Sequence, residues 1–183
     1  MRFSGKAATL LATAATATAL ALVPAAPASQ ATPVAQSLAM QALQTGILQE
    51  LNTLRASHHL KPLVLSPQLS AAATVHDKEM AAKGYFSHDS SDGGQFWQRV
   101  KHFYRASGYN YWAVGENLLW SSPDVDPTNA IKLWYASPEH KKNMLDPHWH
   151  EIGISALHLD SGPGVYGDQS VTIVTTDFGV RTK

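Results

Sequence analysis

The sequence predicts an α+β domain in which helices cover a mainly antiparallel sheet. Apolar residues in the first half recur at spacings of three and four, the period of a helix with one buried face. From residue 151 onward the chain alternates apolar and polar residues and is rich in β-branched side chains, as strands are. Because the helices precede most of the strands, the pattern favours an α+β layered fold over alternating βαβ units.

The helices have recognisable starts and ends. The apolar face of the first consists of residues at helical spacing: Met40, Leu43, Ile47, Leu51 and Leu54. A polar residue followed by proline, which typically begins a helix, occurs three times: at Ser66-Pro67, Asp126-Pro127 and Ser137-Pro138. These pairs predict a second helix that ends at Gly84, a fourth helix through Tyr135, and a short fifth turn. A third helix is predicted over residues 95–107, where Phe96, Val100 and Phe103 share a face.

Three segments have the composition of strands. Residues 109–120 are rich in aromatic residues and are predicted to be extended around a corner at Gly115-Glu116-Asn117. Residues 151–159 and 170–180 alternate more regularly. We expect Asp177 to end the last strand near the functional site.

The N-terminal segment has the features of a secretory signal peptide. Arg2 and Lys6 precede an uncharged apolar stretch over residues 7–23, and small residues follow at the spacing of a cleavage site. The alternative is a membrane anchor, but the alanine and threonine of this stretch make it weakly hydrophobic. We therefore predict a signal peptide over residues 1–28, a linker over 29–38, a domain over 39–183, and an extracellular location with no stable membrane span after cleavage.

Composition excludes several classes of protein. Loss of Arg2 and Lys6 with the signal leaves 12 of the 14 basic residues against 14 acidic ones, so the mature chain carries no excess of positive charge for nucleic acid. The chain contains no cysteine, which excludes thiol catalysis and cysteine-ligated zinc. About 155 residues remain after cleavage, enough to bury a core without disulfides.

Four short motifs follow one another between residues 86 and 179: Phe86–Ser90, Gly115–Leu118, Trp134–Leu145 and Thr176–Gly179. Asn52, Arg55 and Pro62-Leu63 precede them. In this order and spacing the sequence resembles the CAP superfamily over roughly residues 45–180. This superfamily of SCP domains comprises cysteine-rich secretory proteins, antigen 5 and pathogenesis-related proteins, and the resemblance is to its disulfide-free bacterial branch. The resemblance implies an α-β-α sandwich with a central cleft.

In animal and plant members of that family, two histidines and two glutamates line the cleft. The matching positions here are His88, Glu116 and His140, whereas Ser137 stands where the second glutamate would be. With Asp177, these residues form the ligand-binding cleft that the resemblance implies. Two imidazoles could hold Zn²⁺ weakly and exchangeably, with Glu116 binding it directly or through a water.

Each of these residues also has a purely structural interpretation. His88 could cap backbone groups in its loop, Glu116 and its neighbour Asn117 could bond backbone amides, and His140 could cap a helix. His76, on an apolar helix face, is predicted to be a packed histidine with its polar atoms satisfied. His148 and His150 alternate and form an alternative, weaker metal patch.

Three functions stay open at this point. The first is a secreted module that binds a lipid or another small ligand, or a host or envelope component. The second is a hydrolase that uses metal-bound water or a His/Glu pair, with His88, Glu116 and His140 as the candidate catalytic residues. No Gly-x-Ser-x-Gly nucleophile motif occurs, so we expect little turnover. The third is a structural module of the cell envelope with a vestigial site. A metal assay combined with turnover measurements separates the three.

Overall fold

The structure is a computed structural model that describes residues 32–183. The predicted signal peptide, residues 1–28, lies outside the described residues. The helices are α1 (Pro33–Ser57), α2 (Pro67–Lys83), α3 (Phe96–Phe103), α4 (Pro127–Ala136), α5 (Pro138–Leu145) and the short 3₁₀ helix η1 (Gly164–Tyr166). The strands are β1 (Val64–Leu65), β2 (Tyr111–Ser121), β3 (Glu151–Gly162) and β4 (Gln169–Thr182). None of the described helices combines the length and apolarity that crossing a membrane requires.

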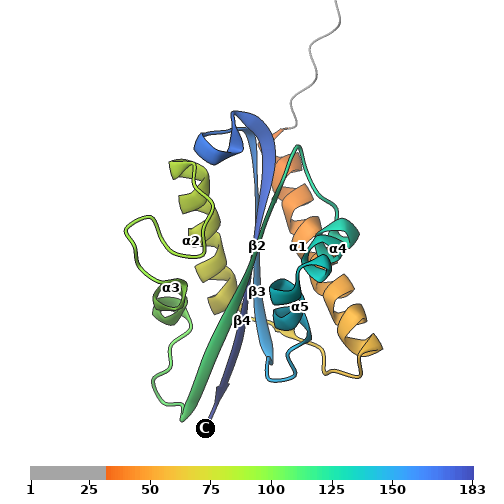
Figure 1. The fold of residues 1–183 in the computed structure, drawn as a ribbon, viewed down its shortest axis with the longest axis vertical. Helices are drawn as coiled ribbons and strands as arrows, with labels where there is room; N and C mark the ends of the chain where they lie inside the picture. The colour runs from red at the N-terminus through yellow and green to blue at the C-terminus, as the bar shows by residue number, and fades with distance from the viewer. Residues whose placement is uncertain (1–31) are drawn as a thin grey trace, which may run out of the picture. The chain divides into compact units, whose positions relative to one another are not determined.

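The elements form three layers (Figure 1). The central sheet has the order β1-β3-β4-β2, in which β3-β4 and β4-β2 are antiparallel and β1 is parallel to β3. Helices α2 and α3 lie on one side of this sheet, and α1, α4 and α5 lie on the other. This arrangement confirms the predicted α-β-α sandwich with its mainly antiparallel sheet.

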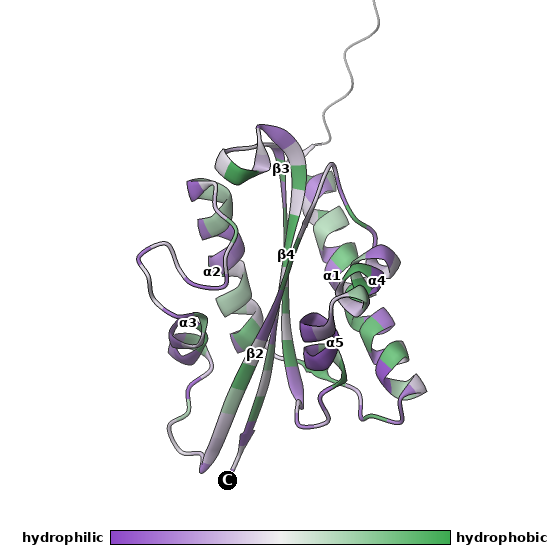
Figure 2. Ribbon diagram, viewed as in Figure 1, coloured by the Kyte–Doolittle hydropathy of each residue, from purple (hydrophilic) through white to green (hydrophobic). Residues whose placement is uncertain are grey.

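A core of buried apolar residues lies on each side of the sheet. On the α1 side, Ile47 and Leu51 pack with Trp134 of α4. On the α2 side, Leu69 packs with Tyr104, which follows α3. Each large apolar side chain removed from water stabilises the fold by about 1.5–3 kcal/mol. The two cores therefore hold the helices against both faces of the sheet. Figure 2 shows hydrophobic and hydrophilic residues mixed along both the strands and the helices.

Local chemistry explains where the helices start. Helices α2, α4 and α5 begin at the predicted prolines, and Gly84 ends α2 in the left-handed region with φ of 64°. Helix α1 starts earlier than predicted, at Pro33, because Thr32 caps it by accepting a hydrogen bond from the amide of Ala35. Residues 33–38 of the predicted linker are therefore helical.

Three further details differ from the sequence predictions. The expected corner at Glu116 is absent from the described chain, since β2 pairs with β4 without interruption from Tyr111 to Ser121. Helix α3 ends at Phe103 rather than near residue 107. Asp177 does not end its strand: it lies inside β4, directly opposite Glu116 and fully buried. Continuous pairing on both sides of β4 keeps these segments extended.

Candidate functional site

The candidate site is built around a hydrogen-bonded pair, His88 and Glu116. His88 belongs to the loop between α2 and α3, and Glu116 to β2. Nδ1 of His88 lies 2.8 Å from Oε1 of Glu116. A carboxylate only accepts, so Nδ1 carries the hydrogen and Nε2 is left for other partners. The Glu116 side chain is 1% exposed and that of His88 50%, so a buried anion orients an accessible imidazole.

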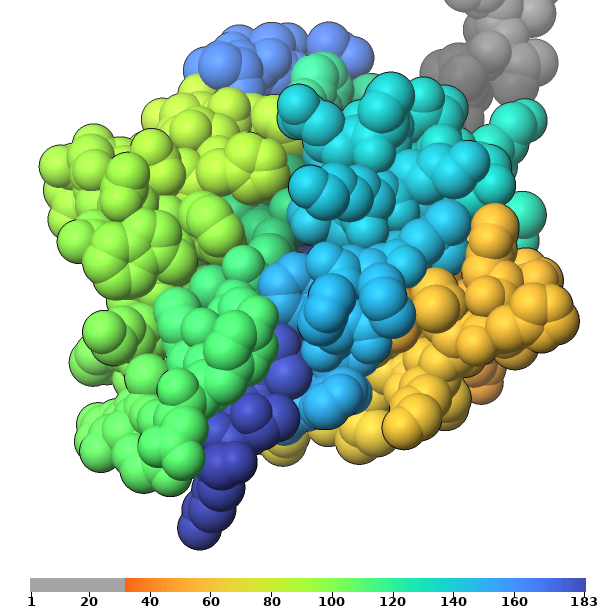
Figure 3. Space-filling view, turned by 60° about the horizontal axis from the view of Figure 1, so that its bottom comes forward, coloured from red at the N-terminus to blue at the C-terminus, as the bar shows by residue number. Residues whose placement is uncertain are grey.

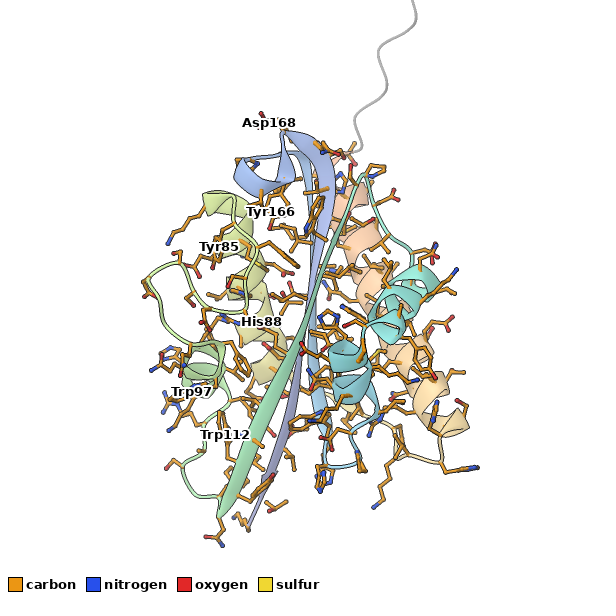
Figure 4. All side chains as sticks on the ribbon, viewed as in Figure 1. Tyr85, His88, Trp97, Trp112, Tyr166 and Asp168 are labelled. Atoms are coloured by element: carbon orange, nitrogen blue, oxygen red, sulfur yellow. The ribbon has the colours of Figure 1, made fainter. Side chains whose placement is uncertain are left out.

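This hydrogen bond also changes how readily His88 is protonated. The carboxylate of Glu116 raises the pKa of His88 above its usual value of 6.5, against the opposing effect of partial burial. In Figure 4 the His88 side chain lies between the α2–α3 segment and β2.

Arg99 of α3 compensates the buried charge of Glu116. Its Nη2 forms an ion pair with Oε2 of Glu116, and its Nη1 donates to the backbone oxygen of His88 at 3.2 Å. The Arg99 side chain is itself nearly buried. A buried ion pair of this kind is costly to break, because removing one partner leaves the other charge unpaired. Arg99 therefore ties the carboxylate and the histidine loop into one unit.

Two further carboxyl groups lie beneath this unit, away from solvent. Asp177 is the cross-strand neighbour of Glu116, and neither of its carboxyl oxygens has a partner among the described residues. Burial, followed by the charge of Glu116, raises its pKa well above the usual value. Asp77 of α2 accepts a hydrogen bond from Thr175, and burial raises its pKa to about 7. We infer that both groups tend to hold a proton, since protonation avoids an unpaired buried charge.

His76 lies next to this acidic region and is fully buried. Its Nε2 is 2.8 Å from the backbone oxygen of Ser87, which anchors the loop that carries His88. Its Nδ1, however, has no partner within residues 32–183, so the prediction of a fully satisfied histidine is right for one ring nitrogen only. Burial lowers its pKa, which favours the neutral imidazole.

The opposite face of β2 is held by α4 and α5. Asn143 donates through Nδ2 to the backbone oxygen of Glu116 at 3.0 Å and to Oδ1 of Asn117 at 2.9 Å. Asn117 in turn donates to the backbone oxygen of His140 at 3.1 Å. This network fixes α5 against the strand. It also supports the structural interpretation of Asn117 that the sequence allowed.

A cleft of about 360 Å³ lies along β2, between the α2–α3 segment on one side and α5 on the other. Figure 3 shows the hollow between the yellow-green α2–α3 segment and the blue α5, with green β2 at its floor. Its lining combines apolar and polar residues: His88, Phe96, Val114, Gly115, Glu116 and Asn143. Two of the five predicted cleft residues, His88 and Glu116, are part of that lining.

The other three predicted cleft residues lie around it. His140 is half-buried on α5, and its pKa is lowered by burial and by the neighbouring charge of His88. Ser137 is the N-cap residue of α5, although its side chain makes no capping hydrogen bond. Asp177 is enclosed behind Glu116.

Arg99, Phe96 and Asn143 were not predicted as site residues. Asn143 lies within the third motif, Trp134–Leu145, three residues after His140, so the motif was its only signal in the sequence. Arg99 and Phe96 lie on a helix between the first and second motifs, where nothing in the sequence distinguishes them from ordinary surface and packing residues.

The structure offers fewer candidate metal ligands than the three, His88, His140 and Glu116, that the sequence suggested. Within residues 32–183 no group of three or more histidine, aspartate or glutamate side chains is arranged to hold a metal ion. Both oxygens of Glu116 are engaged, by His88 and by Arg99. The residues therefore fit a site with at most two imidazoles as protein ligands. In the alternative patch, His148 is exposed and its Nδ1 is 2.8 Å from Asp146.

Comparisons with known proteins agree with this fold. A family model described as "CAP: Cysteine-rich secretory protein family" matches residues 48–176. YkwD of Bacillus subtilis is 30% identical over 123 residues, which cover 67% of this chain and 45% of that protein. The membrane protein YlbC of B. subtilis is 27% identical over 108 residues, covering 59% of this chain and 30% of the relative. The chain thus spans less than half the length of these curated relatives.

Solved structures show the same architecture. An extracellular protein of Bacillus anthracis that contains a SCP domain superposes with a TM-score of 0.64 at 26% identity, covering 85% of this chain and 45% of that one. An outer surface protein of Borrelia burgdorferi has a TM-score of 0.57 at 19% identity, covering 74% and 90%; at that identity it shows the fold alone. The family match over most of the described residues shows that this chain belongs to the CAP family, the cysteine-rich secretory protein family, although it contains no cysteine.

Proposed function

We propose that this protein is an exported module that binds a lipid or another small ligand in the cleft at β2. The observation that carries the proposal is the oriented pair of His88 and Glu116 at the cleft wall. Small-ligand sites are concave and combine apolar walls with a few fixed polar groups. Phe96 and Val114 supply the apolar wall here, and Asn143 adds a polar group. The extracellular protein of Bacillus anthracis that shares this fold supports the location.

A divalent ion, Zn²⁺ above all, is the second part of the proposal. Nε2 of His88 and the imidazole of His140 are the groups that would hold it, with water in the other positions. Glu116 would act behind the ligand by fixing the orientation of His88, a role that carboxylates commonly have beside zinc-binding histidines. When bound, the ion would supply a positive centre for an anionic or carbonyl group of the ligand. Affinity should be modest because the protein contributes few ligands.

A hydrolase is the alternative that the same residues allow. The cleft-lining residues within the described chain include no serine, threonine or cysteine that could act as a nucleophile. We therefore expect little turnover of ester or peptide substrates. A robust rate that disappears in His88→Ala or Glu116→Ala would favour the hydrolase instead.

Zinc calorimetry tests the metal part of the proposal. We expect wild type to bind zinc at pH 7.5 and to lose affinity as the pH falls, because the raised pKa of His88 makes protons compete for it. His88→Ala and His140→Ala should each remove most of the affinity. A His148→Ala/His150→Ala double variant is the matched control, since it removes two imidazoles outside the cleft.

The same titrations separate the alternatives. If only the double variant loses binding, the metal belongs to the patch of His148 and His150. If wild type binds neither zinc nor any lipid or other small ligand, the module is structural and its cleft is vestigial.

A further inference from the structure

The cleft exposes the free edge of the sheet. Strand β2 is the last strand in the order β1-β3-β4-β2, and it pairs with β4 alone. In an antiparallel pair, successive residues direct their backbone N–H and C=O groups alternately toward the partner and away from it. One set of β2 residues therefore directs its backbone groups out of the sheet.

Side-chain hydrogen bonds identify which residues face outward. Asn143 donates to the backbone oxygen of Glu116, and Trp134 donates to that of Leu118 at 2.9 Å. Both donors come from α4 and α5, which cover one side of the sheet, and not from the paired strand β4. The even-numbered residues of β2 thus face away from β4, and Val114 is one of them.

These contacts cap only part of the edge. Within residues 32–183, we find no partner for the backbone N–H and C=O of Val114 or for the backbone N–H of Glu116. Glu116 is only 4% exposed, and a buried amide without an acceptor is unfavourable. Val114, Gly115 and Glu116 are also the three β2 residues that line the cleft. The cleft floor consequently presents a donor, an acceptor and a second donor in a row.

We propose that the ligand of this cleft is a short extended polypeptide segment that pairs with β2 at Val114 and Glu116. The backbone of an extended peptide offers the complementary order of acceptor, donor and acceptor, and proteins commonly bind peptides by adding a strand to a sheet edge. Protein edges that avoid such pairing usually carry a proline, a lysine or a bulge. Residues 111–115, Tyr-Trp-Ala-Val-Gly, carry none of these, and their register with β4 is unbroken.

The walls of the cleft define which side chains the segment should carry. The side chains of Val114 and Glu116 lie on the α2–α3 face, where Val114 packs against the cluster around Leu69 and Glu116 meets His88. Bound residues opposite these two positions direct their side chains to the same face. The residue opposite Val114 contacts Phe96 and should be apolar. The bound residue opposite Glu116 lies near His88, and its side chain should accept a hydrogen bond from that imidazole.

Amide chemical shifts in ¹⁵N-labelled protein test this inference. The probe is the seven-residue peptide Val-Thr-Val-Phe-Val-Thr-Val, acetylated and amidated at its ends, in which threonine lies two positions from the central phenylalanine on either side. At millimolar peptide we expect the amides of Val114 and Glu116 to shift and to exchange more slowly with deuterium. The same peptide with every backbone amide N-methylated should leave both unchanged, because it cannot donate to the oxygen of Val114.

A pair of substitutions separates the backbone from the side chain. Val114→Pro removes one outward N–H but no hydrogen bond to β4, and proline is tolerated on strand edges of this kind. It should weaken peptide binding at least tenfold. Val114→Thr keeps the N–H and the branched shape, so it should change affinity less than threefold. The wild-type shifts decide the matter even if Val114→Pro does not fold.

The inference rests on the proposed ligand-binding function, so zinc and palmitate are included as separate probes. Peptide binding that leaves the Val114 and Glu116 amides unshifted, equal binding of the N-methylated peptide, or no peptide binding at all would each overturn strand pairing. If zinc or palmitate then perturbs the cleft, the ligand-binding function stands without it. If none of the probes perturbs the cleft, the proposed function fails as well.

Discussion

Asp77 should make the stability of this protein fall as the pH rises. Its carboxyl group is fully buried, and burial raises its pKa from 3.8 to about 7 despite hydrogen bonds from Ser155 and Thr175. A carboxyl group whose pKa is raised by folding stabilises the fold fully below its unfolded pKa. That contribution is lost as the pH rises through the folded pKa. The relevant window therefore runs from about pH 4 to pH 8.

The magnitude follows from the size of the shift. Each unit of pKa difference corresponds to 1.36 kcal/mol, so the shift of Asp77 makes the unfolding free energy fall by about 4 kcal/mol between pH 4 and pH 8. Asp77→Asn keeps the shape and the acceptor for Thr175 but cannot ionise. Relative to wild type, this variant should therefore gain about 4 kcal/mol across the same window.

Urea unfolding at pH 4, 6 and 8 measures this difference directly. The exposed Asp124, changed to Asn, is the matched control and should track wild type at each pH, because its side chain already contacts solvent. A difference between wild type and Asp77→Asn that stays constant within about 1 kcal/mol from pH 4 to pH 8 would refute the assignment of a protonated buried carboxyl group.

Three further predictions follow from the site and the sheet. Arg99→Met should destabilise the fold by about 3–5 kcal/mol in urea unfolding, because it leaves the buried Glu116 unpaired, and Lys101→Met on the exposed side of α3 should not. Glu116→Gln should lower the pKa of His88 in an NMR titration, and an unchanged pKa would show that their hydrogen bond does not form in solution. Gly153→Ala should cost about 3 kcal/mol or more, since a Cβ there would lie 2.1 Å from backbone of α2, and a near-neutral variant would contradict that packing.

Local chemistry made the helices predictable from the sequence. A capping residue followed by proline acts within one turn of helix, so the starts of α2, α4 and α5 could be placed without knowing the fold. Strand β1 could not be predicted, because two residues carry no periodicity and their pairing with β3 depends on the assembled sheet. The predicted corner at Glu116 was wrong for a similar reason: glycine suggested a turn, but pairing with β4 keeps the chain extended.

The candidate site was predictable only where a motif marks it. His88 and Glu116 were identified because each lies in a short motif, and the structure brings them into a hydrogen bond across 28 positions of sequence. Arg99 could not be identified, since on its helix it resembles its neighbour Lys101, and only the fold places it against Glu116. The burial of Asp177 could not be predicted either. The alternating pattern of its strand does not show whether helices cover that face of the sheet at this position.

Anomalous diffraction from zinc-soaked crystals tests the central claim most directly, which is that the cleft around His88 is the working site. The account predicts one zinc peak within bonding distance of Nε2 of His88 and of the imidazole of His140, with Glu116 still bonded to Nδ1 of His88. A peak at His148 and His150 with none in the cleft would contradict it.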